Sequence, residues 1–167
     1  MSTRVANGGM LIALAMIFSY VEAILPFNFG IPGIKLGVAN LVIVTGLYLL
    51  KPKDVWCLSL LRILLIGFLF GNGMSILYSL AGGVLSLGVM LLLKKIGGFS
   101  MIGVSVAGGI SHNVGQLIAA VCIVNNLNIA YYLPVLLIAG VITGAIIGML
   151  SDKILHAVSK EGKRKLN

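Results

Sequence analysis

Residues 108–120 read GGISHNVGQLIAA, and this stretch decides how the rest of the chain is interpreted. It lies within a long apolar segment, yet it carries His112, Asn113 and Gln116. Residues three and four apart share one face of an α-helix, so these side chains form a single polar patch. Polar groups in hydrocarbon need partners, so the patch should face the protein interior or a water-filled cavity. Two interpretations stay open: a patch that hydrogen-bonds a neighbouring helix, or the floor of a small-molecule site.

The composition around this stretch is that of an integral membrane protein. Hydrophobic residues make up 59% of the 167 residues, charged residues make up 10%, and the mean hydropathy is +1.13. Soluble domains contain about 25% charged residues. A membrane-spanning helix needs about 20 apolar residues, so the length allows six or seven spans and no separate soluble domain.

We expect one all-α transmembrane domain over residues 1–167, with six helices. Pro, Gly, Asn and Lys residues separate the apolar segments, which predicts spans at about 9–25, 36–50, 55–70, 75–93, 100–124 and 131–156. Six spans place both termini on one side, and that side then holds ten of the twelve Lys and Arg residues. Because basic residues accumulate on the cytoplasmic side, we expect a multi-pass cell-membrane protein with cytoplasmic N- and C-termini.

The charge pattern excludes some partners. The net charge is +8, but the basic residues lie at helix ends and in the tail, and aromatic residues do not alternate with them. This is the pattern of a membrane protein and not of a nucleic-acid surface. The bilayer is therefore the expected partner, with the basic tail at anionic headgroups. Cys57 and Cys122 fall in apolar segments, and we interpret them as core thiols.

Catalysis is not expected. The chain has four acidic residues, and no two of them are placed to chelate a metal within the membrane. It has no aspartate-rich motif for Mg²⁺ and diphosphate, no zinc-ligand spacing and no phosphate-binding loop. We therefore predict no enzyme activity, no metal and no cofactor.

Polar and charged residues near the outer ends of the spans predict a binding pocket that opens outward. Arg62 lies near the middle of its span, where an arginine costs about 2.5–3.5 kcal/mol, and Glu22 is the only carboxylate within a span that could pair with it. Lys35 and Arg62 would favour an anionic or electron-rich ligand. The candidate substrate-binding residues are Glu22, Lys35, Asn40, Arg62, Asn72, Tyr78, His112, Asn113 and Gln116.

Small residues recur every four positions in the first and last spans. Such spacing lets another helix approach closely. In the last span the residues are Gly140, Gly144 and Gly148. In the first span they are Gly9 with Ala13, and Ala15 with Ser19 and Ala23. For the first span, internal packing and docking of a partner protein both stay open.

Three stretches carry a resemblance to a known family: GIKLGVANL at 33–41, LLRILLIGFLFGN at 60–72, and GGISHNVGQLIAA at 108–120. They look like the bacterial Gx transporter family, also labelled heptaprenyl diphosphate synthase component I. That family resembles the S components of energy-coupling factor (ECF) transporters. Those are small six-helix proteins that bind a vitamin or similar nutrient from outside and dock on a transmembrane T component driven by two ATPase subunits.

The resemblance implies a function in transport. We expect an S component that captures a small vitamin-, flavin- or isoprenoid/quinone-precursor-like molecule. By the same resemblance, the small residues of the first span would dock the T component. A second hypothesis is a non-transport membrane subunit associated with prenyl-lipid or quinone-linked redox metabolism.

Overall fold

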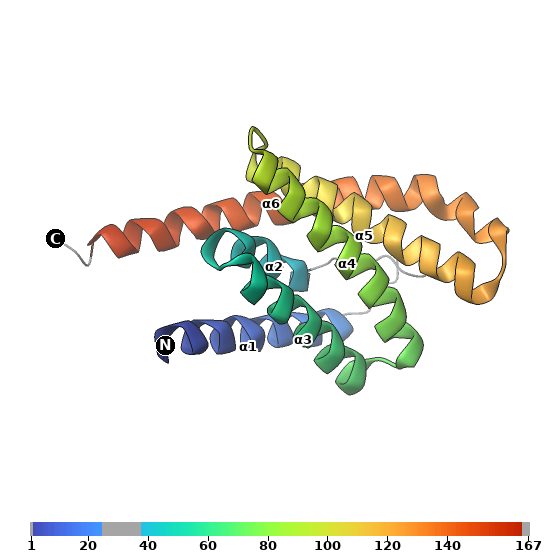
Figure 1. Ribbon diagram of the computed structural model, residues 1–167, viewed down its shortest axis with the longest axis horizontal. Helices are drawn as coiled ribbons and strands as arrows, with labels where there is room; N and C mark the ends of the chain where they lie inside the picture. Colours follow the sequence, from blue (N-terminus) through green and yellow to red (C-terminus); the bar gives the residue numbers. More distant parts are fainter. Residues whose placement is uncertain (1, 25–37, 165–167) are drawn as a thin grey trace.

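The chain forms a bundle of helices (Figure 1). The computed structural model describes the backbone of residues 2–24 and 38–164, and the side chains of residues 9–21 and 39–157. Across these ranges there is no strand, so the all-α prediction is confirmed. The elements are α1 (Ser2–Ile24), α2 (Val38–Leu49), α3 (Pro52–Phe70), α4 (Gly73–Ile96), α5 (Met101–Val124), the 3₁₀ helix η1 (Leu127–Tyr132) and α6 (Leu133–Arg164).

Short polar residues and glycines mark where the helices begin and end. The Asn72 side chain accepts a hydrogen bond of 2.8 Å from the Ser75 backbone N–H and caps the start of α4. Ser100 caps α5 in the same way, because its Oγ accepts from the Gly103 N–H at 3.1 Å. Such caps satisfy amide groups that have no partner within the first helical turn. α4 ends before Gly97, whose φ of +80° is unfavourable for residues with a Cβ.

Each predicted segment contains one α-helix, but the lengths differ from the prediction. α1 and α6 are longer than expected, and α6 continues through the Lys- and Glu-containing tail, whose residues favour helices. Within the described part of the chain, three elements are long and apolar enough to cross a membrane: Gly73–Ile96, Met101–Val124 and Leu127–Ala157. Shorter apolar stretches occupy Gly9–Val21 and Ala39–Leu49.

The helices pack as two groups that are joined through α2 and α3. α5 lies between α4 and α6, while α1 contacts α2 and α3. α2 also contacts α6, and α3 contacts α4, so both connect the two groups. The start of α1 and the end of α6 lie toward the same end of the molecule, and the connection between α5 and η1 lies at the opposite end (Figure 1).

At the glycines of α6, the backbones of α5 and α6 lie directly against each other. A Cβ built on Gly140 would lie 2.9 Å from the carbonyl oxygen of Gly109. One built on Gly144 would lie 2.7 Å from Val106 Cα, and one on Gly148 would lie 2.7 Å from Ile102 Cα. The stripe of glycines on α6 therefore packs inside the chain, against α5.

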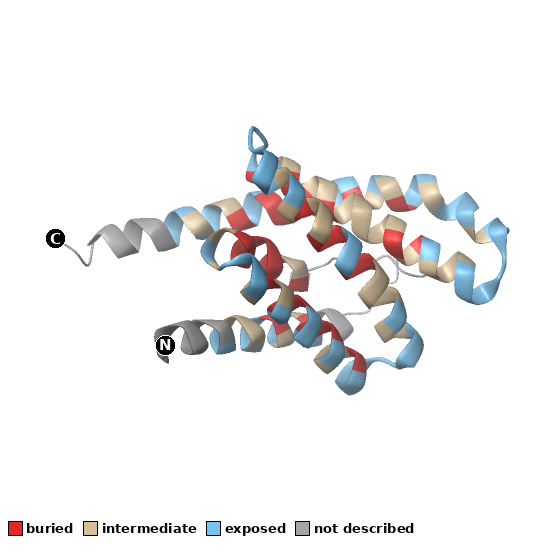
Figure 2. Ribbon diagram, viewed as in Figure 1, coloured by how far each residue is buried: buried red, intermediate tan, exposed pale blue. Residues whose placement is uncertain are grey.

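Aliphatic side chains form the core around α2. Buried residues are concentrated where α2 meets the other helices (Figure 2). Val42, Leu47, Val55, Leu58 and Leu87 are all at most 2% exposed and belong to one cluster. Cys57 and Cys122, by contrast, are exposed on the surface of the bundle, so their assignment as core thiols was wrong. A thiol is a small apolar group, and in a membrane protein such a group can face lipid as well as core.

Candidate binding site

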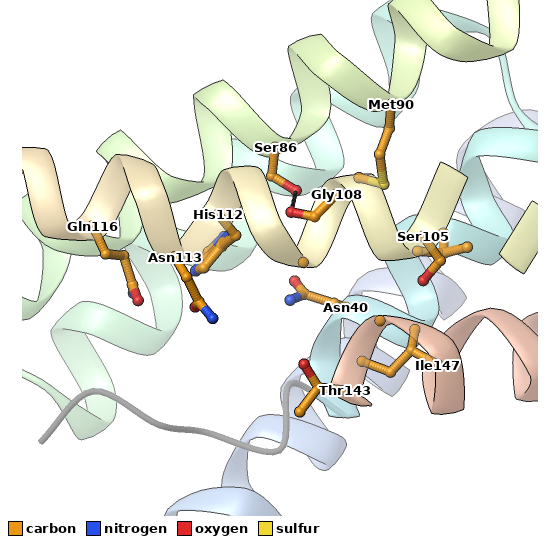
Figure 3. A pocket seen from close by; sticks show the side chains of 13 residues that line it. Asn40, Ser86, Met90, Ser105, Gly108, His112, Asn113, Gln116, Thr143 and Ile147 are labelled. Atoms are coloured by element: carbon orange, nitrogen blue, oxygen red, sulfur yellow. Dashed lines mark hydrogen bonds between the residues drawn. The ribbon is translucent and has the colours of Figure 1, made fainter. Parts of the chain in front are cut away.

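A cavity of about 70 Å³ lies where α2, α4, α5 and α6 meet. α5 contributes the largest share of its wall, including the polar patch. The lining residues are Asn40, Val44, Ser86, Met90, Ser105, Gly108, Gly109, His112, Asn113, Gln116, Thr143, Gly144 and Ile147. The side chains of His112, Asn113 and Gln116 lie along one side of α5, with Asn40 and Thr143 across from them (Figure 3).

The close approach of α4 positions the patch. A Cβ on Gly82 would lie 2.8 Å from Gln116 Cγ and 3.0 Å from His112 Nε2. A Cβ on Gly115 would lie 2.7 Å from the Ala81 carbonyl oxygen. The absence of side chains at Gly82 and Gly115 thus lets His112 and Gln116 lie directly against the α4 backbone.

Hydrogen bonds connect the helices that form the walls of the cavity. Asn113 donates from Nδ2 to the Leu136 carbonyl oxygen at 2.7 Å and so connects α5 to α6. Ser86 donates from Oγ to the Gly108 carbonyl oxygen at 2.8 Å and connects α4 to α5 (Figure 3). Thr143 donates to the Ala139 carbonyl oxygen at 2.8 Å, within its own helix.

α2 lines the cavity with residues of its first two turns. Asn40 and Val44 lie four residues apart, on one face of the helix, and both line the cavity. α2 has 12 residues, which corresponds to about 18 Å of length. Because Asn40 lines the same cavity as His112, Asn113 and Gln116, this part of α2 lies next to the α5 patch.

Four of the predicted binding residues come together and three described ones lie elsewhere. Asn40, His112, Asn113 and Gln116 all line the cavity. Asn72 is exposed and caps α4, and Tyr78 is half-buried on α4 outside the cavity lining. Arg62 is 8% exposed within α3, and it does not line the cavity.

The remaining predicted residues fall outside the described side chains. Lys35 lies in the segment 25–37, and Glu22 and Ala23 lie in α1 beyond its described side chains. The pairing of Glu22 with Arg62 thus stays a prediction, although α1 and α3 do pack together. The described lining residues include no lysine or arginine, so this part of the wall does not supply the expected cations.

The small residues of α1 divide between two faces. Ala15 is 0% exposed and Ser19 is 7% exposed, so both pack inside the bundle. Gly9 and Ala13 are exposed, on the opposite side. Ala15 and Ser19 therefore pack inside the chain, and a docking surface on α1 stays a prediction for the exposed Gly9 and Ala13 and for Ala23, whose side chain is outside the described residues.

Sequence reasoning missed several lining residues. Ser86 and Met90 on α4, and Ser105, Thr143 and Ile147 on α5 and α6, were not predicted. The sequence did contain a signal for two of these residues, which is their position beside glycines. Thr143 precedes a glycine of the α6 stripe, and Ser86 lies one helical turn after Gly82. Hydroxyl groups beside close-packing glycines are common between membrane helices, so they did not stand out as ligand groups.

The fold and the cavity define a helical membrane protein with a polar interior site. In the described side chains, no group of three or more His, Cys, Asp or Glu residues is placed to hold a metal ion. A family model described as heptaprenyl diphosphate synthase component I matches residues 11–154, which is most of the chain. The chain belongs to this family, and the resemblance found in its motifs is confirmed. Searches of curated proteins and of solved structures each found no match.

Proposed function

We propose that the chain is the substrate-binding membrane subunit of an importer of the ECF type, which captures a small nutrient-like molecule from outside. The observation that carries this proposal is the polar cavity between α2, α4, α5 and α6. Polar side chains within a membrane bundle mark substrate or ion paths when they surround a cavity. Ligand sites in helical bundles lie between helices, as this one does.

Helix packing alone does not account for the cavity. The bond from Asn113 to the Leu136 carbonyl explains why an amide stands at that position. If packing were the only role of the patch, the polar groups would close on one another and fill the space. Instead Asn40, His112, Asn113 and Gln116 surround an opening of about 70 Å³.

Mass spectrometry of small molecules released from the protein tests this function. The protein is purified in mild detergent, denatured, and its supernatant analysed beside that of a His112→Leu variant. We expect one compound at near-stoichiometric amount from the wild type and its loss from the variant. The matched control is His156→Leu. It is the same substitution, made at a side chain that is 80% exposed near the end of α6. Equal recovery from all three proteins, or from none, would contradict the proposal.

The proposed orientation places both termini in the cytoplasm. Lys51, Lys53, Lys94 and Lys95 lie in exposed positions at the ends of α2, α3 and α4, in keeping with a cytoplasmic surface. Single cysteines at Asn126 and Phe99 test the orientation in a Cys57→Ser, Cys122→Ser background. A membrane-impermeant maleimide added to whole cells should label the cysteine at 126 and leave the one at 99 unlabelled. The reverse pattern would place the termini outside.

An importer subunit of this type needs a T component and two ATPase subunits. Gly9 and Ala13 lie on the exposed side of α1, where small residues let a second helix approach. We expect Gly9→Leu with Ala13→Leu to lower co-purification of a co-expressed T component and to leave the released compound unchanged. The matched control is Met10→Leu, because Met10 is 66% exposed and already large.

The family description favours a second function, a membrane subunit associated with prenyl-lipid or quinone-linked metabolism. This subunit would hold a lipid head within the bundle and assist a soluble enzyme. It predicts co-purification with a soluble prenyl-transferring or redox enzyme, and release of a prenyl lipid or quinone. Recovery of a water-soluble nutrient together with the ATPase subunits would decide against it.

A further inference from the structure

The described wall of the cavity is polar and holds no lysine, arginine, aspartate or glutamate. More than half of its residues have side chains with an amide, a hydroxyl or an imidazole: Asn40, Ser86, Ser105, His112, Asn113, Gln116 and Thr143. The other described lining residues are apolar or glycine. An asparagine or glutamine side chain offers both hydrogen-bond donors and an acceptor, and a hydroxyl group offers both as well. The wall can therefore complement a group that both donates and accepts.

An anion would be costly among the described lining residues. Moving an ionised carboxylate or phosphate out of water into a membrane interior is strongly unfavourable unless charged or multiple strong donors compensate it. Arg62, which the sequence suggested as a counter-ion, lies outside the lining. A neutral amide or imide costs far less to desolvate, and the amides of Asn40, Asn113 and Gln116 can replace its bonds to water.

The size of the cavity limits what enters it. An engineered cavity of about 150 Å³ binds benzene, whereas one water needs about 10–15 Å³. The cavity here has about 70 Å³, so it accepts a group smaller than a benzene ring. A whole vitamin or flavin would extend beyond it, and only one end of such a molecule would lie among the side chains of the patch.

Helices α2, α4 and α6 determine how a group bound in the cavity would be oriented against the α5 patch. The α4 backbone at Gly82 supports the His112 ring and the Gln116 stem from one side. From the other side, α2 brings Asn40 and α6 brings Thr143 (Figure 3). A group held between them meets side-chain donors and acceptors from at least three helices, and this selects for a compact head group with both functions.

We propose that the cavity recognises a compact uncharged head group with adjacent hydrogen-bond donor and acceptor atoms, such as a carboxamide, and discriminates against carboxylates and phosphates. This inference rests on the proposed binding function, because it names the chemistry that the same site selects. It differs from the expectation of an anionic or electron-rich ligand that the sequence suggested through Lys35 and Arg62.

Thermal unfolding of the purified protein in lipid nanodiscs tests the inference. The probe is the small-molecule content of yeast extract, separated by ion exchange into an uncharged and an anionic fraction. We expect the uncharged fraction to raise the Tm of the wild type and of His156→Leu, and to leave the Tm of His112→Leu unchanged. The anionic fraction should have no effect on any of them.

The two other outcomes separate the two proposals. If the anionic fraction alone raises the Tm of the wild type, and does not raise that of His112→Leu, the head-group inference is overturned and the binding function stands. If neither fraction raises the Tm of the wild type, the binding function fails, and the inference fails with it.

A nearly isosteric change tests the cavity without altering its volume. Gln116→Glu replaces the amide donor with a carboxylate, and its Tm without added probe reports whether the variant folds. We expect at least about a tenfold higher concentration of the uncharged fraction for the same rise in Tm, since loss of one well-placed hydrogen bond to a buried group is worth about 1.4 kcal/mol or more. An unchanged concentration dependence would overturn the inference.

Discussion

α5 and α6 contact each other through backbone, whereas α2 contacts its neighbours through aliphatic side chains. At Gly140 and Gly144, no side chain separates the two helices, and any added carbon meets main-chain atoms within 3 Å. Around Leu47 and Val42, the space is filled by branched side chains that are at most 2% exposed. Side chains can change rotamer to absorb a small change, but two packed backbones must move apart as whole helices.

This difference locates the cavity at the boundary between a rigid and a more adaptable part of the bundle. The polar patch belongs to α5, which is held between α4 and α6 by glycine contacts. Asn40 and Val44 belong to α2, which is held by side-chain packing. Because lipid is as apolar as a leucine side chain, these contacts depend on close packing and hydrogen bonds and not on exclusion of water.

The largest loss of stability should follow a change at a backbone contact. In Gly144→Val, the first added carbon would lie 2.7 Å from Val106 Cα and 2.8 Å from the Ser105 carbonyl oxygen. Neither atom can move without displacing α5, so we expect a cost of about 3 kcal/mol in the free energy of unfolding. Reversible unfolding in mixed micelles of dodecyl sulfate measures it.

Gly88→Ala is the matched control for this change. Gly88 is also a helical glycine, but a Cβ there meets nothing within 4 Å. Replacing glycine by alanine in a helix is favourable by about 0.5–1 kcal/mol, so this variant should be as stable as the wild type or more stable. If Gly144→Val is tolerated as well as Gly88→Ala, the distinction between the two kinds of packing does not hold.

A smaller loss is expected in the side-chain core. Leu47 is 1% exposed, and Leu47→Ala leaves a void that its neighbours fill only in part. We expect Leu47→Ala to lower the free energy of unfolding by about 2 kcal/mol. This is the lower end for such a change, because lipid gives no additional advantage to burying an apolar group. Leu92→Ala is the control, since Leu92 is 57% exposed and should cost little. A larger loss of unfolding free energy for Leu47→Ala than for Gly144→Val would contradict the expected order.

The same contrast explains what the sequence could predict. The apolar segments, the turn residues between them and the spacing of His112, Asn113 and Gln116 predicted the helices and the one polar face of α5. These are local properties, fixed by periodicity along one helix. The glycine stripe on α6 also correctly predicted close packing against another helix. That this helix is α5 is known only from the structure.

Contacts between distant helices were predicted only in part. Asn40 was expected to line one pocket with the α5 patch, and it does line the cavity, but Asn72 and Tyr78, expected in the same pocket, lie outside the lining. Arg62 looked like a pocket residue because a charge within a span suggests a cavity, yet it is buried within α3 outside the lining. Spacing along a chain gives the face of a helix, and only packing tells what that face meets.

A polar contact between the two helix groups should contribute less than either kind of packing. Lys94 at the end of α4 donates a hydrogen bond to the Leu47 carbonyl oxygen, and its Nζ lies 4.9 Å from the centre of the Tyr48 ring. That carbonyl is in the last turn of α2, where a cation is favourable. We expect Lys94→Met to cost about 1 kcal/mol in the same unfolding assay.

Lys95→Met separates the contact from the charge. Lys95 is the next residue on α4 and is exposed, and its side chain points about 100° away around the helix. Both variants remove one positive charge from the same end of the molecule, so a specific contact predicts a larger loss for Lys94→Met. Equal losses would show that the general charge at this end matters and the contact with α2 does not.

The smallest effect should come from the hydroxyl that bridges α4 and α5. Ser86 is buried and donates to the Gly108 carbonyl oxygen at 2.8 Å, while Ser111 donates to the Ala107 carbonyl oxygen of its own helix at 2.6 Å. Hydrogen bonds between membrane helices average about 0.6 kcal/mol, so we expect that cost for Ser86→Ala and almost none for Ser111→Ala. Since a Cβ on Gly108 would already lie within 3 Å of Met90, α4 and α5 stay in register without the hydroxyl. A loss at Ser86 comparable with that of Gly144→Val would mean that polar bridges, and not backbone contacts, hold α5 in place.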